Sequence, residues 1–349
     1  MKICHIIFAF NTGGTETMLV DIMNEQVKTE TVTLIIVNNL INENIIVKIN
    51  SNVHIIRINR KPSSKNPIPL LKINHYLFQS KPDIIHFHNV NGIGLILPCF
   101  RKKAVLTIHA NRIRYPFFTR YKKLFTISQS VKKDILMRYG LEAKVVYNGV
   151  HNSAIIIKQR PERNNRFRIV QVGRLHHTEK GQDLLIMAMK QLVYDYGQTD
   201  IYLDFIGEGP SFSFLEQLVA DSKLGSHIAF SGNKSRDYVY KHLCDYDLLV
   251  QPSVNEGFGL TVAEAMAAKV PVLVSNVEGP MEIIESGKYG YYFKSENVND
   301  LAAKITDIIE NYRTEKHHYM IENAYKHVLA NFDIKNTALN YLVAYKAIK

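Results

Sequence analysis

The sequence has few cysteines and no long hydrophobic run, and each absence excludes a class of protein. Its three cysteines, Cys4, Cys99 and Cys244, lie far apart, and an odd number at this spacing argues against a disulfide framework. None belongs to a CxxC pair, so a zinc site built on them is not expected. No stretch approaches the roughly 18 uncharged apolar residues of a membrane span. These absences predict a cytoplasmic protein that is not integral to a membrane.

The first residues, MKICHIIFAF, need a separate interpretation because a short apolar start can mark a signal peptide. This run is short and ends in NTGGTET, without a small-residue cleavage site. We therefore expect a buried first strand that leads into a glycine turn. NTGGTET also lacks the GxGxxG spacing of dinucleotide-binding enzymes, which argues against an oxidoreductase.

The formal net charge of +11 lies in the first half of the chain, since the residues after 150 hold slightly more acidic than basic side chains. Residues 101–144 alone carry 12 lysines and arginines against 2 acidic residues. Such a field attracts phosphate groups or an anionic surface. The alternative is a solvated face that only keeps the protein in solution.

Short runs rich in isoleucine and valine alternate with helical segments in both halves of the chain. With 349 residues, of which 46% are hydrophobic, the chain can bury two cores. Apolar runs bounded by polar turns are typical of parallel strands covered on both faces. The fold class is therefore α/β, with two doubly wound, Rossmann-like parallel-sheet domains. Ligands are expected at the carboxyl ends of the strands, in a cleft across which the domains face each other.

The alternation stops in a polar, basic segment that contains Pro161 and restarts at Arg166. A long amphipathic helical tail follows from about Val298. The boundaries that we predict are an N-terminal Rossmann-like domain over 1–152, a linker over 153–166, a C-terminal Rossmann-like domain over 167–328, and a final helix over 329–349 that packs back toward the first domain.

The segment PSVNEGFGLTVAEAMA combines a strand end, a glycine-containing loop and a helix start near Leu260. The backbone N–H groups at such a start favour a phosphate. Glu256 and Glu264 flank it, and a carboxylate can accept hydrogen bonds from two vicinal hydroxyls of a sugar. The alternative is that both glutamates only complement the helix dipole. The donor-binding residues predicted here are Gly257, Phe258, Gly259, Leu260, Thr261 and Glu264.

Two cations precede another helix at the end of an earlier strand. Arg174 follows the strand RFRIVQV, and Lys180 comes six residues later, so both are placed to hold a diphosphate. Ordinary surface charge is the alternative. Further strand-end turns follow in FIGEGP and HIAFSGN. These turns add Gly173, Gly207 and Glu208 to the predicted donor-binding residues.

Taken together, these motifs resemble the family-4 retaining glycosyltransferases of GT-B fold over essentially the whole chain. In the second half the resemblance lies in GRL…EKG, GEGP, FSGN, PS…EGFGLTVAEAMA and PV…EGPMEII. In the first half it lies in NTGGTET, PDIIHFHN, LTIHA, TISQSVKKDIL and VVYNGV. The ensemble is very specific, although each motif alone is only suggestive.

The resemblance implies a role for individual residues. Arg174 and Lys180 match the pair that binds the donor diphosphate, Glu256 the glutamate that contacts the donor sugar, and Glu264 the one that holds the ribose. His109 matches the histidine that reaches the transferred sugar, although a purely structural hydrogen bond is the alternative. Ala110 stands where family members often carry an acidic residue, which leaves the orientation of His109 open. The predicted catalytic residues are Arg174, Lys180, Glu256 and His109. Gly13 and Gly14 match the glycine loop of the first domain, which closes over the donor phosphates or borders the acceptor, so they join the predicted donor-binding residues.

Two other groups of polar residues look like metal ligands. His86 and His88 alternate on one strand and so share a face, but without a third ligand we favour a structural role. Asp245 and Asp247 resemble a DxD motif, yet they precede a buried strand and are interpreted as helix-end and strand-entry groups. The resemblance likewise implies no catalytic metal and no cofactor, because fixed cations and a helix dipole can stabilise the leaving diphosphate. We expect front-face attack with retention of configuration.

The acceptor is expected on the basic first half. Its cations alternate with Tyr115, Phe117, Phe118 and Tyr121, a mixture that suits a membrane interface. We predict a peripheral enzyme at the inner face of the plasma membrane that extends a lipid-linked saccharide in capsule or O-antigen synthesis. Nucleic acid is not expected as a partner, because no motif for it accompanies the charges. The residues predicted for this face are Arg112, Arg114, Arg120, Lys122 and Lys123.

The donor predicted from family frequency is a UDP-linked hexose or N-acetylhexosamine, with GDP-mannose second. Two alternatives to a glycosyltransferase stay open. One is a nucleotide-sugar epimerase or a phosphorylase of the same two-domain fold. The other is a non-catalytic homologue, against which the intact cations and glutamates argue.

Overall fold

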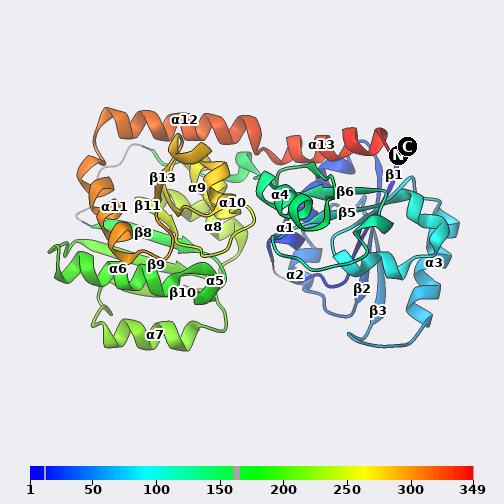
Figure 1. Ribbon diagram of the computed structural model, residues 1–349, viewed down its shortest axis with the longest axis horizontal. Coiled ribbons are helices and arrows are strands. Elements are labelled where there is room, and N and C mark those ends of the chain that lie inside the picture. Colours follow the sequence, from blue (N-terminus) through cyan, green and yellow to red (C-terminus); the bar gives the residue numbers. More distant parts are fainter. Residues whose placement is uncertain (12, 160–165, 349) are drawn as a thin grey trace. The chain divides into compact units, whose positions relative to one another are not determined.

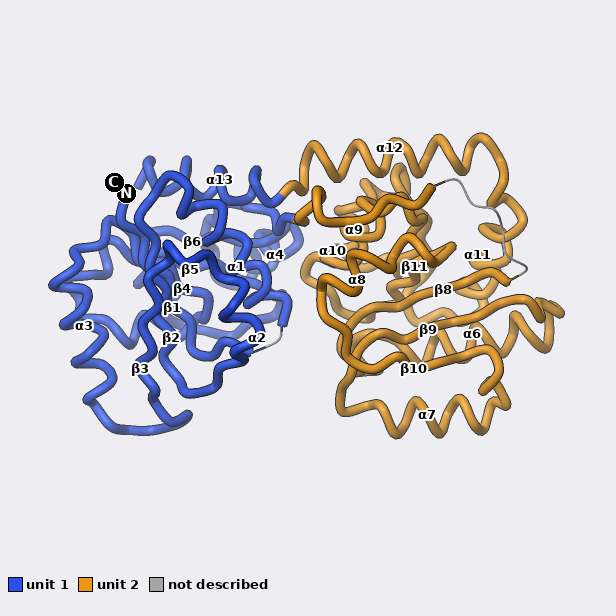
Figure 2. Tube along the Cα trace, turned by 180° about the vertical axis from the view of Figure 1, so that it is seen from behind, with its two compact units in different colours: residues 1–149, 334–349 blue, residues 150–333 orange. Residues whose placement is uncertain are grey.

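The computed structural model describes residues 1–11, 13–159 and 166–348, and it divides into two compact units (Figure 2). Unit 1 comprises Met1–Gly149 together with Ile334–Lys349, and unit 2 comprises Val150–Asp333. Part of the predicted linker, residues 160–165, lies outside the described residues. Among the described residues, no helix is long and apolar enough to cross a membrane.

Unit 1 is built on a seven-stranded sheet of order β3-β2-β1-β4-β5-β6-β7, in which every neighbouring pair is parallel (Figure 1). The order reverses between β1 and β4, which makes their carboxyl ends the place where a doubly wound sheet binds ligands. The strands are β1 (Lys2–Ile7), β2 (Thr31–Asn38), β3 (His54–Arg60), β4 (Ile84–Phe87), β5 (Ala104–Ile108), β6 (Lys123–Thr126) and β7 (Lys144–Val145).

Helices connect these strands, as parallel pairing requires. Local signals place their ends. Ser128 caps α4 by accepting a hydrogen bond from the Val131 N–H, and Gly140 ends the same helix with φ +64°. The helices of unit 1 are α1 (Gly14–Gln26), α2 (Glu43–Ile46), α3 (Ile68–Ser80), α4 (Gln129–Tyr139) and α13 (Ile334–Lys346), with short 3₁₀ turns η1 (Val90–Leu95), η2 (Pro98–Lys103) and η3 (Phe118–Arg120).

Helix α13 belongs to unit 1 although it comes from the far end of the sequence. It packs beside α1 and buries Tyr341 and Tyr345. The Tyr341 hydroxyl lies 3.0 Å from Oγ1 of Thr107 on β5, and the Tyr345 hydroxyl lies 2.5 Å from Nδ1 of His86 on β4. These contacts attach the C-terminal segment to the centre of the first sheet.

Unit 2 repeats the plan with six parallel strands in the order β10-β9-β8-β11-β12-β13. The strands are β8 (Phe167–Val172), β9 (Ile201–Ile206), β10 (Ile228–Gly232), β11 (Leu248–Gln251), β12 (Val272–Ser275) and β13 (Tyr291–Phe293). The helices are α5 (His177–Lys180), α6 (Gln182–Tyr194), α7 (Phe212–Asp221), α8 (Arg236–His242), α9 (Leu260–Ala267), α10 (Glu278–Ile283), α11 (Val298–Asn311) and α12 (Glu315–Asn331), with 3₁₀ turns η4 (Asn152–Ala154), η5 (Leu243–Asp245) and η6 (Glu285–Gly287). Here the order reverses between β8 and β11.

The predicted fold class, two Rossmann-like parallel-sheet domains, is confirmed. The long helical tail expected from Val298 is in fact three separate helices, α11, α12 and α13. Thr314 caps α12 by accepting a hydrogen bond from the His317 N–H, and α12 ends before Phe332 leaves helical geometry. These two breaks allow the tail to be shared between the units, with α11 and α12 in unit 2.

Candidate functional site

Glycine loops bring the carboxyl ends of the central strands of unit 2 into close contact. The Gly173 N–H donates to the Ile206 carbonyl, and the Gly207 N–H donates to the Gly232 carbonyl, both at 2.9 Å. A Cβ added at Gly207 would lie 1.9 Å from the Gly173 oxygen, and Gly207 has φ +147°. Only glycine fits this close approach and this conformation. The predicted donor-binding residues Gly173 and Gly207 therefore shape the edge of the sheet.

The start of α9 carries no side-chain cap. Gly259 precedes the helix with φ +109°, and the first intrahelical bond runs from the Val262 N–H to the Gly259 carbonyl. The amide groups of Leu260 and Thr261 come before that bond and therefore remain available to an anion. Phe258 is buried directly before this turn and so anchors it. The helix start therefore lacks a side-chain cap, and its role as a phosphate site stays a prediction.

Lys180 and Glu256 form an ion pair of 2.6 Å between Nζ and Oε2. Both side chains are mostly buried, with 23% and 17% of their surfaces exposed. The backbone brings them together, because the N–H group of Val254 donates to the Glu179 carbonyl at 2.9 Å. A Cβ on Gly181, at the end of α5, would lie 2.1 Å from the Pro252 oxygen. The segments that carry the two predicted catalytic residues are thus packed backbone to backbone.

Arg174 stands apart from this pair. Its side chain is exposed, and in the described part of the chain no hydrogen bond or ion pair joins it to Lys180 or Glu256. Its carbonyl accepts a hydrogen bond from Nε2 of Gln182 at 3.1 Å, which holds the backbone between β8 and α6. The guanidinium is therefore free to move to an incoming anion while its backbone stays in place.

Glu264, predicted to hold the ribose, is buried on the second turn of α9 and lies 3.7 Å from Nε of Arg236. Arg236 also stacks over the Tyr240 ring, 4.8 Å from its centroid. A buried carboxylate needs such a partner, because desolvation disfavours its charged form. Glu208, the other predicted acidic contact, is exposed, and its Oε1 lies 3.4 Å from the Asn233 amide nitrogen.

In unit 1 the predicted glycine loop forms the start of α1, directly after the β1 edge. Gly13 precedes the helix and Gly14 is its first residue. The Gly13 carbonyl accepts hydrogen bonds from both the amide and the hydroxyl of Thr17. The backbone at Gly13 is extended, and an added Cβ would lie 2.5 Å from Oε2 of Glu16, the end of a side chain that can move away. Burial raises the pKa of Glu16 above its ordinary value.

His109 follows β5 and is partly exposed. Its Nε2 lies 3.4 Å from Nδ1 of His88, and burial lowers the pKa of His109 to about 4. The ring is therefore neutral at neutral pH and can act as a hydrogen-bond acceptor. The structure thus gives His109 a definite partner, which its sequence context did not.

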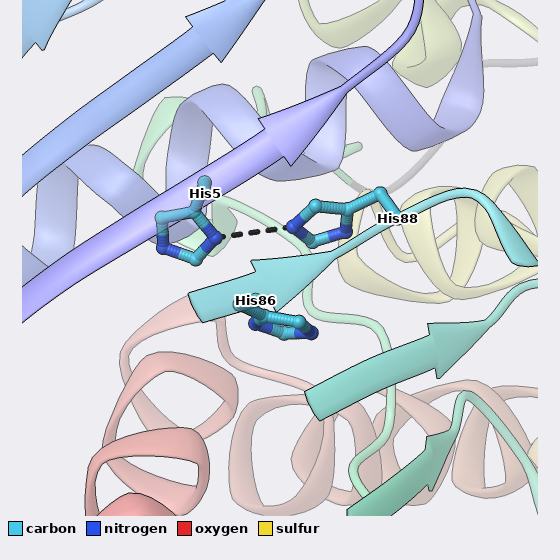
Figure 3. A group of neighbouring side chains, drawn as sticks. All are labelled: His5, His86 and His88. Atoms are coloured by element: carbon cyan, nitrogen blue, oxygen red, sulfur yellow. Dashed lines mark hydrogen bonds between the residues drawn. The ribbon is translucent and has the colours of Figure 1, made fainter. Parts of the chain in front are cut away.

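His86 and His88 have a third neighbour that their spacing did not reveal. The β1–β4 register pairs His5 with His86, and the ligand nitrogens of His5, His86 and His88 all lie within 4.8 Å of one another (Figure 3). Each ring nitrogen nevertheless already has a polar partner. Those of His5 contact Gln26 and His88, those of His86 contact Tyr345 and Thr107, and the second nitrogen of His88 contacts His109. A metal would have to break at least two of these contacts, so the geometry favours a hydrogen-bonded cluster.

Two family models match the chain one after the other. The model of the glycosyl transferases group 1 matches residues 152–327, and that of Glycosyltransferase Family 4 matches residues 12–153. The chain belongs to the group 1 glycosyl transferases. The resemblance of its motifs to the family-4 glycosyltransferases is thereby confirmed.

Three similar proteins place this glycosyltransferase among its relatives. The uncharacterized glycosyltransferase MJ1178 of Methanocaldococcus jannaschii is 30% identical over 70% of this chain and 71% of its own length. The poly(ribitol-phosphate) alpha-N-acetylglucosaminyltransferase of Staphylococcus aureus is 27% identical over 54% of this chain and 37% of its own. The structure of HepE from Anabaena in complex with UDP and glucose has a TM-score of 0.82 at 19% identity, covering 99% of this chain and 100% of that one.

The basic residues predicted for the acceptor face of this glycosyltransferase do not lie at one edge of its sheet. Arg112 and Arg114 follow the carboxyl end of β5, whereas the Lys122 N–H donates to the Ala104 carbonyl at the amino end of β5. Lys123, which opens β6, is half-buried, and Arg120 is exposed over the Phe117 ring, 4.0 Å from its centroid.

Two of the four aromatic side chains predicted to contact a membrane are part of the core. Phe118 and Tyr121 are buried, and the Tyr121 hydroxyl donates to the Val90 carbonyl at 2.7 Å. Phe118 packs edge-on against Tyr139. The prediction is wrong for these two residues, because they anchor the β5–β6 connection. Phe117 is 42% exposed and Tyr115 is half-buried, so these two alone of the four reach the surface.

One residue that links the predicted site residues of unit 2 was missed. Gln251 ends β11 and is buried. Its Nε2 donates to Oγ of Ser253 at 2.8 Å and lies 3.4 Å from Oε2 of Glu256, while its Oε1 accepts from the Thr261 hydroxyl at 3.3 Å. The sequence signal for Gln251 was its position, as a polar residue at the end of the apolar strand LLVQ.

Proposed function

We propose that this glycosyltransferase moves a hexose or N-acetylhexosamine, with retention, from a nucleotide-diphosphate sugar to a saccharide acceptor. The proposed donor is UDP-linked and the proposed acceptor is lipid-linked, as in the synthesis of a bacterial capsule or O-antigen. The observation that carries the proposal is the Lys180–Glu256 pair beside the uncapped start of α9. A cation, a carboxylate and free amide groups suit the diphosphate and the hydroxyls of one donor molecule.

The charges of unit 2 also suggest how the reaction proceeds. The departing diphosphate gains negative charge as the glycosidic bond breaks, and Lys180, Arg174 and the α9 amides can stabilise that charge without a metal ion. When the donor binds, Glu256 gives up its bond to Lys180 and accepts hydrogen bonds from hydroxyls of the sugar. We propose front-face attack, in which the acceptor hydroxyl gives its proton to the departing phosphate. His109 accepts a hydrogen bond from a hydroxyl of the transferred sugar.

The acceptor side of the proposal rests on unit 1. An open hollow of about 390 Å³ is lined by Arg114, Tyr115, Pro116, Arg138 and Tyr139. Two guanidinium groups beside tyrosine rings suit a phosphate or diphosphate attached to a saccharide. The name of the Staphylococcus aureus relative describes transfer to a phosphate-containing polymer. A lipid diphosphate would offer the same chemistry together with an anionic membrane surface.

A nucleotide-sugar panel tests the donor assignment. We expect UDP and one UDP-sugar to raise the unfolding temperature of the protein, since a ligand at 100 times its Kd stabilises by about 2.7 kcal/mol. The shift should persist in EDTA, because we propose that side chains and not a metal hold the diphosphate. The selected donor, mixed with a synthetic polyprenyl-diphosphate saccharide, should release UDP and give a product with the donor's anomeric configuration by NMR. An inverted anomer, or an epimerised nucleotide sugar formed without acceptor, would contradict the proposal.

Vesicle binding tests the membrane part of the proposal. The protein should co-sediment with anionic vesicles of phosphatidylglycerol and phosphatidylcholine, and added salt should weaken binding. The variant Arg112→Glu/Arg114→Glu should lose this binding, because both side chains are exposed at the carboxyl end of β5. The matched variant Lys122→Glu/Lys123→Glu lies at the opposite end of that strand and should bind more strongly than the arginine variant. Binding that survives both double substitutions would refute the membrane assignment.

A further inference from the structure

A single file of hydrogen bonds crosses the sheet of unit 1 and ends at His109. Oε1 of Gln26, the last residue of α1, lies 2.8 Å from Nε2 of His5 on β1. The dashed line in Figure 3 marks the next contact, in which Nδ1 of His5 lies 3.1 Å from Nε2 of His88. Nδ1 of His88 lies 3.4 Å from Nε2 of His109. Gln26 and His5 are fully buried and His88 is 6% exposed, so water has little access to these links. Only the last ring, His109, reaches the surface.

The number of protons in this file determines where each one sits. Burial lowers the pKa of His5 and His109 to about 4 and that of His88 well below its ordinary value, so all three rings are neutral at pH 7. A neutral imidazole has one N–H donor and one acceptor nitrogen. The Gln26 carbonyl can only accept, so Nε2 of His5 carries the proton and Nδ1 of His5 accepts. His88 then donates through Nε2 and accepts through Nδ1.

The same rule determines the tautomer of His109. His109 must donate from Nε2 to the Nδ1 acceptor of His88, which leaves Nδ1 of His109 without a proton. Within the described part of the chain no group hydrogen-bonds that nitrogen. We infer that Gln26, His5 and His88 are positioning residues that hold His109 neutral in its Nε2–H tautomer and offer its Nδ1 lone pair to a hydroxyl of the transferred sugar. The contact with the sugar rests on the proposed function, whereas the tautomer of His109 does not.

His86 is excluded from this file although it is the immediate neighbour of the other rings. Its ring is tilted against that of His88, with centroids 4.4 Å apart, yet its nitrogens bond the Tyr345 hydroxyl and Oγ1 of Thr107. Through these two groups it attaches α13 and β5 rather than His109. His86 therefore fills the space beside the file without passing a proton along it.

A pair of substitutions at one position separates hydrogen bonding from packing. In His88→Asn, Oδ1 takes the place of the ring Nδ1 and can still accept from His109. In His88→Gln, the amide reaches the place of Nε2 and no acceptor remains beside His109. Both replace an aromatic ring with an amide, so a role in packing alone predicts similar behaviour. Gln26→Leu removes the carbonyl that sets the direction of the file, three links away from His109.

NMR of the ¹⁵N-histidine-labelled protein without ligand reads the tautomers directly. Long-range ¹H–¹⁵N correlations should show His109 as the Nε2–H form in the native protein and in His88→Asn. His88→Gln and Gln26→Leu should show a mixture of tautomers. A native His109 that is protonated at Nδ1, or identical His109 signals in the asparagine and glutamine variants, would overturn the inference. Intact amide spectra of each variant identify those that have kept their fold.

UDP release with the donor selected by the panel measures the consequence for catalysis. We expect kcat to fall about tenfold in His88→Gln and to be largely restored in His88→Asn, the size of one lost hydrogen bond to the sugar. The affinity for UDP alone should stay unchanged, because most of the predicted nucleotide contacts belong to unit 2 and none involves His88. An unchanged kcat in His88→Gln would overturn the positioning role. A native protein without activity toward any donor would instead contradict the proposed function, and the NMR result would still decide the tautomer.

Discussion

Lys180→Ala is expected to lower kcat for sugar transfer by about 10²–10³, the cost of removing one preorganised group that stabilises charge in the transition state. The ammonium group lies 2.6 Å from Glu256 and is mostly buried, so it is already oriented before a donor arrives. Substrate and transition state both carry the diphosphate, but the negative charge on its leaving oxygen grows only during bond cleavage. The loss should therefore be larger in kcat than in the affinity for UDP. Steady-state kinetics together with UDP titration measures both.

Matched variants separate this role from general charge effects. Lys190→Ala removes an exposed lysine from the neighbouring helix α6 and should leave kcat within about twofold. Glu256→Gln keeps a hydrogen-bonding side chain but removes the carboxylate, so it should weaken discrimination between donor sugars more than binding of UDP. If Lys180→Ala keeps the native kcat, Lys180 does not stabilise the leaving group, and the proposed mechanism fails at its central step.

The ion pair itself is not the source of the expected effect. A partly buried pair gains Coulomb energy but loses hydration, so its net contribution to stability is small. If the pair were only structural, the double variant Lys180→Ala/Glu256→Ala would be about as stable as the native protein. Its activity would then fall only in proportion to any loss of folded protein. The proposed mechanism instead expects the double variant to fold normally and to be at least as inactive as Lys180→Ala. Thermal unfolding and kinetics on the same samples distinguish the two cases.

The fold and the start of α9 were predictable because their causes are local in the sequence. Alternating apolar runs and helices indicate buried parallel strands wherever they occur, and both sheets have this pattern. A glycine before an apolar helical run marks a helix start, and Gly259 precedes α9 as its spacing indicates. The ion pair of Lys180 with Glu256 joins residues 76 positions apart and was not predicted, since the motif ensemble indicated only that both residues contact the same donor.

The partners that the prediction missed come from elements that the fold brings together. His5 meets His86 through the β1–β4 register, and Arg236 meets Glu264 from a different helix. Nothing in the neighbourhood of either residue in the sequence signals such a pairing. The error at Phe118 and Tyr121 has the opposite origin, because a basic stretch of sequence hides which of its aromatic residues anchor a connection. Hydrophobic residues between cations can be core residues, and only their contacts decide.

Acidification from pH 7 to pH 5 is expected to destabilise unit 1 strongly through its buried histidines. In the folded protein burial holds the pKa of His5 at about 4 and those of His86 and His88 well below 6.5, whereas in the unfolded chain each is near 6.5. Between these values the unfolded state binds protons that the folded state does not, so the free energy of unfolding falls as the pH falls. Once the unfolded rings are mostly protonated, below about pH 6, each histidine contributes up to about 1.4 kcal/mol per pH unit. These three together then lose up to about 4 kcal/mol per unit, to which His109 adds, and this is a large part of the roughly 5–15 kcal/mol typical of a domain.

Other buried groups beside the cluster do not offset this loss. Burial raises the pKa of Cys4, Tyr341 and Tyr345 further above neutrality, so they stay protonated throughout the range. Unit 2 contains His317, whose pKa burial lowers to about 4, and His327, whose pKa burial also lowers, and its stability should fall less steeply with fewer such rings than unit 1. Hydrogen exchange followed by mass spectrometry, corrected for the intrinsic effect of pH, resolves peptides of the two units. Peptides of β1, β4 and β5 should lose protection at a higher pH than those of β8 and β11.

Substituting the titrating rings tests the cause of this difference. His88→Asn cannot take up a proton, so its free energy of unfolding should vary less with pH than that of the native protein, even if it is lower at pH 7. The slope between pH 6 and pH 5 should decrease by about 1.4 kcal/mol per unit for each histidine removed. An unchanged slope in His88→Asn, with equal loss of protection in both units, would mean that these rings are already protonated in the folded state. That result would also remove the neutral His109 on which its role as an acceptor depends.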